Sequence, residues 1–256
     1  MATPGKKNVT ADVEGHRMRQ PLDWQIAILK DVKPETAKVK SFTFTLPNWI
    51  QHRAGQHYDL RLTAEDGYQA QRSYSIASEP EQEGEIDLTV ERIEDGEVST
   101  YLHDVLVPGD RLEMRGPIGG YFVWEATFIP EPLVLIGGGS GVVPLMSMIR
   151  HRAVAGSKVP TRLLYSVRTF EDIIYFNELE KLRADGSGLE VFYTLTRSQP
   201  PNWNGYNRRI DDQMLKELIK PFDKSAQVFI CGPTLLVEAA ANSLVKLGLP
   251  VAQIRT

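Results

Sequence analysis

The chain has 256 residues, of which 42% are apolar and 24% charged, the composition of a globular protein with one large or two small domains. Its 29 basic and 33 acidic residues give a net charge of −4, which argues against nucleic acid as a partner. The single cysteine, Cys231, excludes an internal disulfide, a four-cysteine zinc site and a self-contained cysteine-ligated iron–sulfur cluster. We therefore expect no metal, and a reducing compartment such as the cytoplasm.

Residues 1–20 are polar and contain no apolar run, which predicts a flexible tail without a targeting signal. The longest uncharged stretch, residues 132–149, contains two prolines and a cluster of glycines. This pattern favours a buried strand, a loop and the start of a helix over a membrane span. We expect no membrane anchor.

Short runs rich in β-branched and aromatic residues recur in residues 21–127, with turn residues between them. Residues 41–46 and 85–90 alternate strictly between polar and apolar, which is typical of strands with one buried face. The pattern predicts a small antiparallel β-barrel with one short helix at residues 99–106. Its expected strands are residues 24–32, 38–46, 56–62, 71–78, 85–93 and 110–116.

Apolar runs alternate with helical segments in residues 128–256, which predicts an α/β domain with a parallel sheet and crossover helices. A boundary between the two domains is expected near residues 124–131, marked by Pro130 and Pro132. The expected strands are residues 133–136, 162–167, 189–196 and 227–231, and the expected helices are residues 144–155, 176–184, 211–219 and 235–247.

A glycine-rich loop, residues 137–144, lies between an expected strand and an expected helix. Glycines allow close approach of the backbone to a pyrophosphate, and the start of a helix offers unpaired N–H groups to an anion. Pro144 suits the first helical position but stands where the usual dinucleotide fingerprint has a third glycine. The loop predicts a nucleotide site, with a tight structural turn as the alternative.

Two motifs in the barrel half are ambiguous when taken alone. In Arg72-Ser73-Tyr74-Ser75, the arginine can bind a phosphate and the tyrosine can lie on a ring system, but a solvated strand face explains the residues equally well. In Gly96-Glu97-Val98-Ser99, the amides and a hydroxyl can hold an anion or simply begin a helix.

Together, five motifs in this order resemble the ferredoxin–NADP reductase superfamily, in particular its flavodoxin- and dioxygenase-reductase-like members without an iron–sulfur domain. The resemblance covers about residues 22–256. The five motifs are Arg72-Ser73-Tyr74-Ser75, Gly96-Glu97-Val98-Ser99, Gly116-Pro117-Ile118-Gly119, Gly139-Ser140-Gly141-Val142-Val143-Pro144 and Cys231-Gly232-Pro233.

The resemblance implies a barrel that binds FAD and an α/β domain that binds NAD(P)H, with hydride passing from the nicotinamide to flavin N5. Tyr74 would stack on the flavin, Ser75 would lie near N5, and Cys231 would lie beside the nicotinamide. Other expected cofactor-binding residues are Arg72 and Ser73, the backbone of Thr89 and Val90, Gly96, Val98 and Ser99, the loop residues Gly138, Gly139, Ser140, Gly141, Val142 and Pro144, and Gly232 and Pro233.

The resemblance also favours NADP over NAD, because Ser166, Arg168 and Arg197 match the 2′-phosphate pocket of the superfamily. Glu171 and Asp172 leave NAD as the alternative coenzyme, since a carboxylate there can accept a hydrogen bond from a ribose hydroxyl. Many relatives end in an aromatic residue over the flavin, whereas this sequence ends at Thr256; either the chain continues or that flavin face is open.

The expected function is that of an FAD-dependent NAD(P)H reductase that passes single electrons to a separate ferredoxin, flavodoxin, cytochrome or oxygenase component. The alternatives are a non-catalytic flavin-binding subunit, a variant that uses FMN, and a nicotinamide dehydrogenase without flavin.

Overall fold

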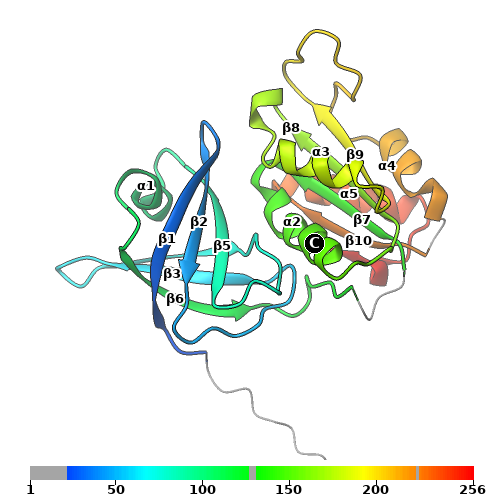
Figure 1. The fold of residues 1–256 in the computed structure, drawn as a ribbon. Helices are drawn as coiled ribbons and strands as arrows, with labels where there is room; N and C mark the ends of the chain where they lie inside the picture. The colour runs from blue at the N-terminus through cyan, green and yellow to red at the C-terminus, as the bar shows by residue number, and fades with distance from the viewer. Residues whose placement is uncertain (1–21, 127–130, 223–224) are drawn as a thin grey trace, which may run out of the picture.

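A computed structural model describes residues 22–126, 131–222 and 225–256 (Figure 1). Within them the chain forms two lobes, an antiparallel sheet in the N-terminal half and a parallel sheet flanked by helices in the C-terminal half. The expected tail at residues 1–20 and the expected boundary between residues 127 and 128 lie outside the described residues.

The N-terminal sheet has six strands in the order β4-β3-β6-β1-β2-β5. A further antiparallel bridge from Ile76, just after β4, to Leu88 of β5 closes it into the expected barrel. Alternation decides which residues face inward: Ile86, Leu88 and Val90 of β5 are buried in the barrel core. The elements are β1 Gln25–Thr36, β2 Val39–Thr45, β3 His57–Thr63, β4 Gln69–Ser75, β5 Glu85–Glu91, the helix α1 Glu97–Asp104, and β6 Arg111–Ile118.

The C-terminal sheet has five parallel strands in the order β11-β10-β7-β8-β9, which confirms the expected α/β domain. Its strands are β7 Leu133–Gly138, β8 Thr161–Val167, β9 Leu189–Leu195, β10 Gln227–Cys231 and β11 Ile254–Arg255. Its helices are α2 Val142–Val154, α3 Phe176–Ala184, α4 Asp212–Ile219 and α5 Thr234–Lys246, with short 3₁₀ turns at Gly139–Gly141, Phe170–Asp172, Lys220–Phe222 and Val251–Gln253.

Helices cover both faces of this sheet (Figure 1). Alternate residues of each strand face opposite sides, so Leu135 packs in the core that contains α2 and α3, and its neighbour Val134 packs in the core that contains α4 and α5. In the described residues no helix is both long and apolar enough to cross a membrane.

One apolar core extends from the α2 and α3 face of the sheet into the barrel half. Ala54, Ala77 and Trp124 belong to the same buried cluster as Met146 and Met148 of α2. Trp124 is fully buried, and its backbone pairs with Ala54 in an antiparallel bridge. The two domains therefore share an apolar interface, and α2 lies directly on it.

Most element ends are shifted from the predicted ones, including those of α1, which was expected at residues 99–106. Three further differences lie in the C-terminal domain. Strand β7 continues through Gly137 and Gly138, because both pair with β8 at Tyr165 and Ser166. Helix α2 begins at Val142, so Pro144 is its third residue instead of its first. Strand β11 was not predicted, since two residues are too few to show a pattern.

Candidate functional site

A cavity of about 160 Å³ opens where the barrel meets the C-terminal domain. It brings residues expected to bind flavin together with a residue expected to bind the dinucleotide. Its lining residues are Ser73, Tyr74 and Ser75 of β4, Thr89 and Glu91 of β5, Ile93 of the next loop, Ser140 of the glycine loop and Val143 of α2. A reaction between two cofactors needs such a meeting point, because the reacting atoms must come within about 3 to 3.5 Å of each other.

Strand β4 carries Arg72 and Tyr74 on one face, opposite Leu60 and Tyr58 of β3. Tyr74 is half-buried against the barrel core, and this burial raises its pKa to about 12, so the phenol stays neutral. Arg72 is exposed; its Nη1 donates to the carbonyl of Gln71 at 2.6 Å, and it makes no ion pair within the described residues. A free guanidinium two residues from a half-buried ring suits a ring cofactor that carries phosphate.

The two serines of this strand differ in what their hydroxyls do. Ser73 donates to Asp59 Oδ1 at 2.6 Å, and Arg115 donates to the other carboxylate oxygen at 2.7 Å. Burial alone would raise the pKa of Asp59, but these two hydrogen bonds bring it below its ordinary value, so Asp59 is charged. Ser75 lines the cavity and makes no side-chain hydrogen bond in the described part of the chain. Its hydroxyl is therefore available to a ligand.

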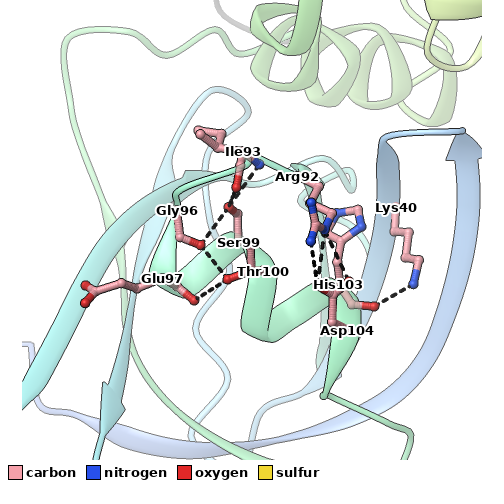
Figure 2. A network of polar contacts seen from close by, with 9 residues as sticks. All are labelled: Lys40, Arg92, Ile93, Gly96, Glu97, Ser99, Thr100, His103 and Asp104. Atoms are coloured by element: carbon pink, nitrogen blue, oxygen red, sulfur yellow. Dashed lines mark hydrogen bonds and ion pairs between the residues drawn. The ribbon is translucent and has the colours of Figure 1, made fainter.

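Helix α1 begins at Glu97 beside β5, and no side chain caps it (Figure 2). The Ser99 hydroxyl is turned into the preceding loop, where it accepts from the amide of Ile93 at 3.1 Å. His103 anchors the helix to β5 through a 2.9 Å contact between its Nε2 and the carbonyl of Val90. The groups left for an anion are therefore the first-turn backbone amides of residues 97–99.

The glycine loop packs against the backbone that follows β10. A Cβ atom on Gly141 would lie 2.3 Å from the carbonyl oxygen of Cys231, and a Cβ atom on Gly138 would lie 3.0 Å from Pro233 Cδ. Gly232 approaches Gly138 just as closely, since a Cβ atom there would lie 3.0 Å from the Gly138 backbone. Gly139 has a φ of 54° and its carbonyl accepts from the Tyr165 hydroxyl at 3.1 Å. The loop leads into α2, whose first-turn amides are suited to a phosphate.

Some expected site residues can contribute only their backbone. The side chains of Val90 and Val98 lie in the barrel core, and that of Val142 lies in the core shared by both domains. Cys231 is half-buried opposite Gly137, and burial raises the pKa of its thiol. The thiol stays protonated at neutral pH and is a poor nucleophile.

The residues expected to bind a 2′-phosphate lie together at the carboxyl ends of β8 and β9. The amide of Arg197 donates to the carbonyl of Arg168 at 2.9 Å, which makes the two residues neighbours. Both side chains are exposed and unpaired within the described residues, whereas Ser166 is buried beside Gly138. The geometry is compatible with two guanidinium groups on one phosphate.

Sequence reasoning missed the polar contacts that join the domains. Arg150 of α2 donates to the carbonyl of Ala77 at 2.8 Å, Ser147 donates to that of Ser78 at 2.7 Å, and Tyr175 donates to Thr89 Oγ1. Each joins residues at least 69 positions apart, and no local pattern marks such pairs. They hold α2 and the start of α3 against the wall of the cavity.

The residues around the cavity and the glycine loop fit FAD in the barrel and a nicotinamide dinucleotide on the loop. A half-buried neutral ring, an exposed guanidinium and three helix-start amides suit a flavin dinucleotide. The glycine loop suits a second pyrophosphate, because the space beside Gly139 is open and the loop leads into the first turn of α2. No group of three or more metal-ligating side chains occurs among the residues described.

Two family models match separate segments of the chain. An "Oxidoreductase FAD-binding domain" family model matches residues 27–123, and an "Oxidoreductase NAD-binding domain" model matches residues 135–242. The chain is 30% identical over 249 residues to NADH-cytochrome b5 reductase 1 of Aspergillus terreus, a match that covers 93% of this chain and 83% of that protein.

It is also 34% identical over 215 residues to a glycine betaine monooxygenase reductase subunit of Pseudomonas aeruginosa, covering 82% of this chain but only 57% of that subunit. Among solved structures, the CS-b5R domains of human Ncb5or in the NAD+ form match with a TM-score of 0.81 and 25% identity, over 98% of this chain and 76% of that one. A ferredoxin NADP+ reductase of Neisseria gonorrhoeae with bound FAD and NADP shares the fold, with a TM-score of 0.75 and 21% identity over 90% and 96% of the two chains.

Proposed function

This chain belongs to the flavin-dependent NAD(P)H oxidoreductases of the ferredoxin–NADP reductase superfamily, and we propose that it is the reductase of a two-protein electron-transfer system. Its electrons go to a separate redox protein or oxygenase component. The cavity at the domain junction carries the proposal, because Tyr74 and Ser75 of the FAD-binding domain face Ser140 and Val143 of the NAD-binding domain there.

When bound, FAD accepts two electrons as hydride from the nicotinamide and can release them one at a time. The chain's own residues hold and orient the cofactors: Tyr74 would support the flavin ring, Ser75 would offer its free hydroxyl near N5, and Arg72 would bind a phosphate. The backbone of Thr89 and Val90 would contact the flavin, and the amides at residues 97–99 would hold its pyrophosphate, because the Gly96 amide already donates to the carbonyl of Ile93. The shared apolar interface packs the two domains against each other beside the cavity.

On the nicotinamide side, residues 138–144 would hold the dinucleotide, with Cys231, Gly232 and Pro233 beside its reactive ring. Arg168 and Arg197 support NADPH as the preferred donor, since both are exposed, adjacent and unpaired within the described residues. We place the two functional units at residues 21–127 and 128–256. The relatives named for monooxygenases favour an oxygenase component as the acceptor, and the reducing coenzyme and the lone cysteine favour the cytoplasm.

The test is an anaerobic titration of the FAD-loaded protein with NADPH and then NADH, following the visible flavin band. Rapid bleaching by either coenzyme is the expected result, with NADPH faster. If the flavin stays oxidised with both, the NAD-binding domain is not competent and the chain acts as a flavin-binding subunit. If the pure protein binds no FAD, the reductase proposal is wrong.

A further inference from the structure

Glu91, the last residue of β5, lies at the domain junction. Its carboxylate lines the cavity, and its Oε2 accepts a hydrogen bond from the Ser140 hydroxyl at 2.8 Å. Ser140 is the middle residue of the 3₁₀ turn Gly139–Gly141, which belongs to the glycine loop. A negative side chain of the FAD-binding domain is therefore bonded directly to the loop that we assign to the dinucleotide.

No neighbouring cation neutralises this carboxylate in the residues that the structure describes. Arg92, the next residue along the chain, turns away and forms a paired contact with Asp104 of α1, with its Nη2 2.8 Å from Oδ2 (Figure 2). Successive side chains of a strand point to opposite sides, so Arg92 cannot serve both acids. Glu91 is therefore an acid without an ion-pair partner among the described residues, and it lies beside the loop.

The end of the glycine loop, where α2 begins, is a site that favours an anion. The glycine loop runs into the first turn of α2, and a helix start presents unpaired amides and the positive end of its dipole. The pyrophosphate of a dinucleotide would be drawn to this place, and Glu91 already supplies a negative group there. Two anions within a few ångströms of each other repel by roughly a kcal/mol even when they are well solvated.

We propose that Glu91 is a competing anion at the dinucleotide loop, which holds Ser140 while the loop is empty and weakens the binding of NAD(P)H and of its oxidised product alike. This inference rests on the proposed function. It makes Glu91 a residue that sets coenzyme affinity, and the repulsion acts on the pyrophosphate, which NAD and NADP share. Weaker binding of the product shortens the time for which it blocks the junction.

Glu91→Gln tests the charge alone, because glutamine has the same length and its amide oxygen can still accept from Ser140. We would measure the dissociation constants of NADP+ and NAD+ by calorimetry with the full FAD-loaded chain, since neither oxidised coenzyme can reduce the flavin. At low ionic strength the variant is expected to bind both coenzymes about three- to tenfold more tightly. The gain should shrink at about 0.5 M salt, where charges are screened over a few ångströms.

Glu65→Gln is the matched control, because it removes the same charge from an exposed position in the β3–β4 hairpin, and its constants should stay within about twofold of those of the unmodified chain. An unchanged dissociation constant for Glu91→Gln would overturn the proposal. Weaker binding of the coenzymes by Glu91→Gln would overturn it too, since it would mean that the carboxylate accepts a hydrogen bond from the coenzyme. If the unmodified chain binds neither coenzyme, the proposed function itself is wrong.

Discussion

The phenol of Tyr175 donates a hydrogen bond to Thr89 Oγ1 and so joins the NAD-binding domain to a wall of the cavity at the domain junction. Tyr175 is buried and has a φ of 61°, a left-handed conformation that is uncommon for a bulky residue. Arg150 lies 4.9 Å from the centre of its ring, and Thr89 continues the contact to Ser41 at 2.8 Å. A strained conformation persists only where several contacts hold it, and here they hold the domain junction.

Tyr175→Phe should lower the free energy of unfolding by about 1 to 2 kcal/mol, because a buried hydroxyl loses its partner while the ring still fits. The measurement is urea denaturation of the FAD-loaded protein. Tyr206→Phe is the control, because the Tyr206 hydroxyl donates to Glu217 at 2.6 Å in an exposed setting. Its removal should lower the free energy of unfolding by no more than about 0.5 kcal/mol. Equal losses in the two variants would contradict a special role for Tyr175.

Gly141→Ala should disrupt the dinucleotide loop. The added Cβ atom would lie 2.3 Å from the Cys231 carbonyl oxygen and 2.5 Å from the Gly232 amide nitrogen, and backbone atoms cannot yield as a flexible side chain does. We expect a loss of about 1 to 3 kcal/mol in unfolding free energy and weaker binding of NADP+, measured by denaturation and calorimetry. In Gly120→Ala nothing lies within 4 Å of the new atom, so both quantities should be nearly unchanged.

Arg72→Ala should weaken flavin retention about ten- to a hundredfold, as expected for the loss of hydrogen bonds to a charged phosphate. The measurement is the dissociation constant of FAD from quenching of its fluorescence. Arg183→Ala, which removes an exposed arginine paired only with Glu180 of α3, should leave this constant unchanged. An Arg72 variant that retains flavin like the unmodified chain would remove Arg72 from the proposed site.

Arg197→Ala should raise KM for NADPH about tenfold or more while leaving that for NADH within about twofold, since only NADPH carries the 2′-phosphate. Steady-state kinetics with a small-molecule electron acceptor gives both constants, and NADH serves as the internal control. Equal effects on the two coenzymes would mean that Arg197 supports the loop and does not read the phosphate.

His52 makes stability depend on pH. It is 2% exposed, and burial lowers its pKa to about 4. An unfolded chain binds the proton near pH 6.5, so between pH 6.5 and 4 the unfolded state holds more protons and stability falls as the pH falls. The loss across this window is about 3 kcal/mol, checked by urea denaturation at several pH values. His52→Gln should flatten the profile, and an identical profile would refute the assignment.

Local patterns were sufficient for much of the fold and for the motifs. The range 176–184 is helix α3 and the range 227–231 is strand β10, because their hydrophobic periods and flanking turn residues are unambiguous. The barrel strands were shifted by up to a few residues, since pairing partners and not propensity decide where a strand ends. Strand β7 shows this plainly, as its two glycines remain in the sheet through their partners on β8.

The site could be predicted only as a set of motifs. Its cavity depends on Thr89 and Glu91 facing Ser140, and these pairs are set by how two domains pack. Glu91 is the last residue of an alternating strand, and its sequence context is that of an ordinary exposed acid. Tyr175 precedes a helix whose pattern predicts nothing about Thr89. Contacts between residues so far apart in the sequence depend on tertiary structure, and they produce no periodic pattern in the sequence itself.

The burial of Trp124 and Ala54 in the same core as Met146 and Met148 has a consequence for folding. Domains usually move and melt separately when their interface is small and polar, but an apolar interface couples their unfolding. Both domains should therefore unfold together in a single cooperative thermal transition. A ligand that binds only the barrel would then raise the melting temperature of the parallel sheet as well.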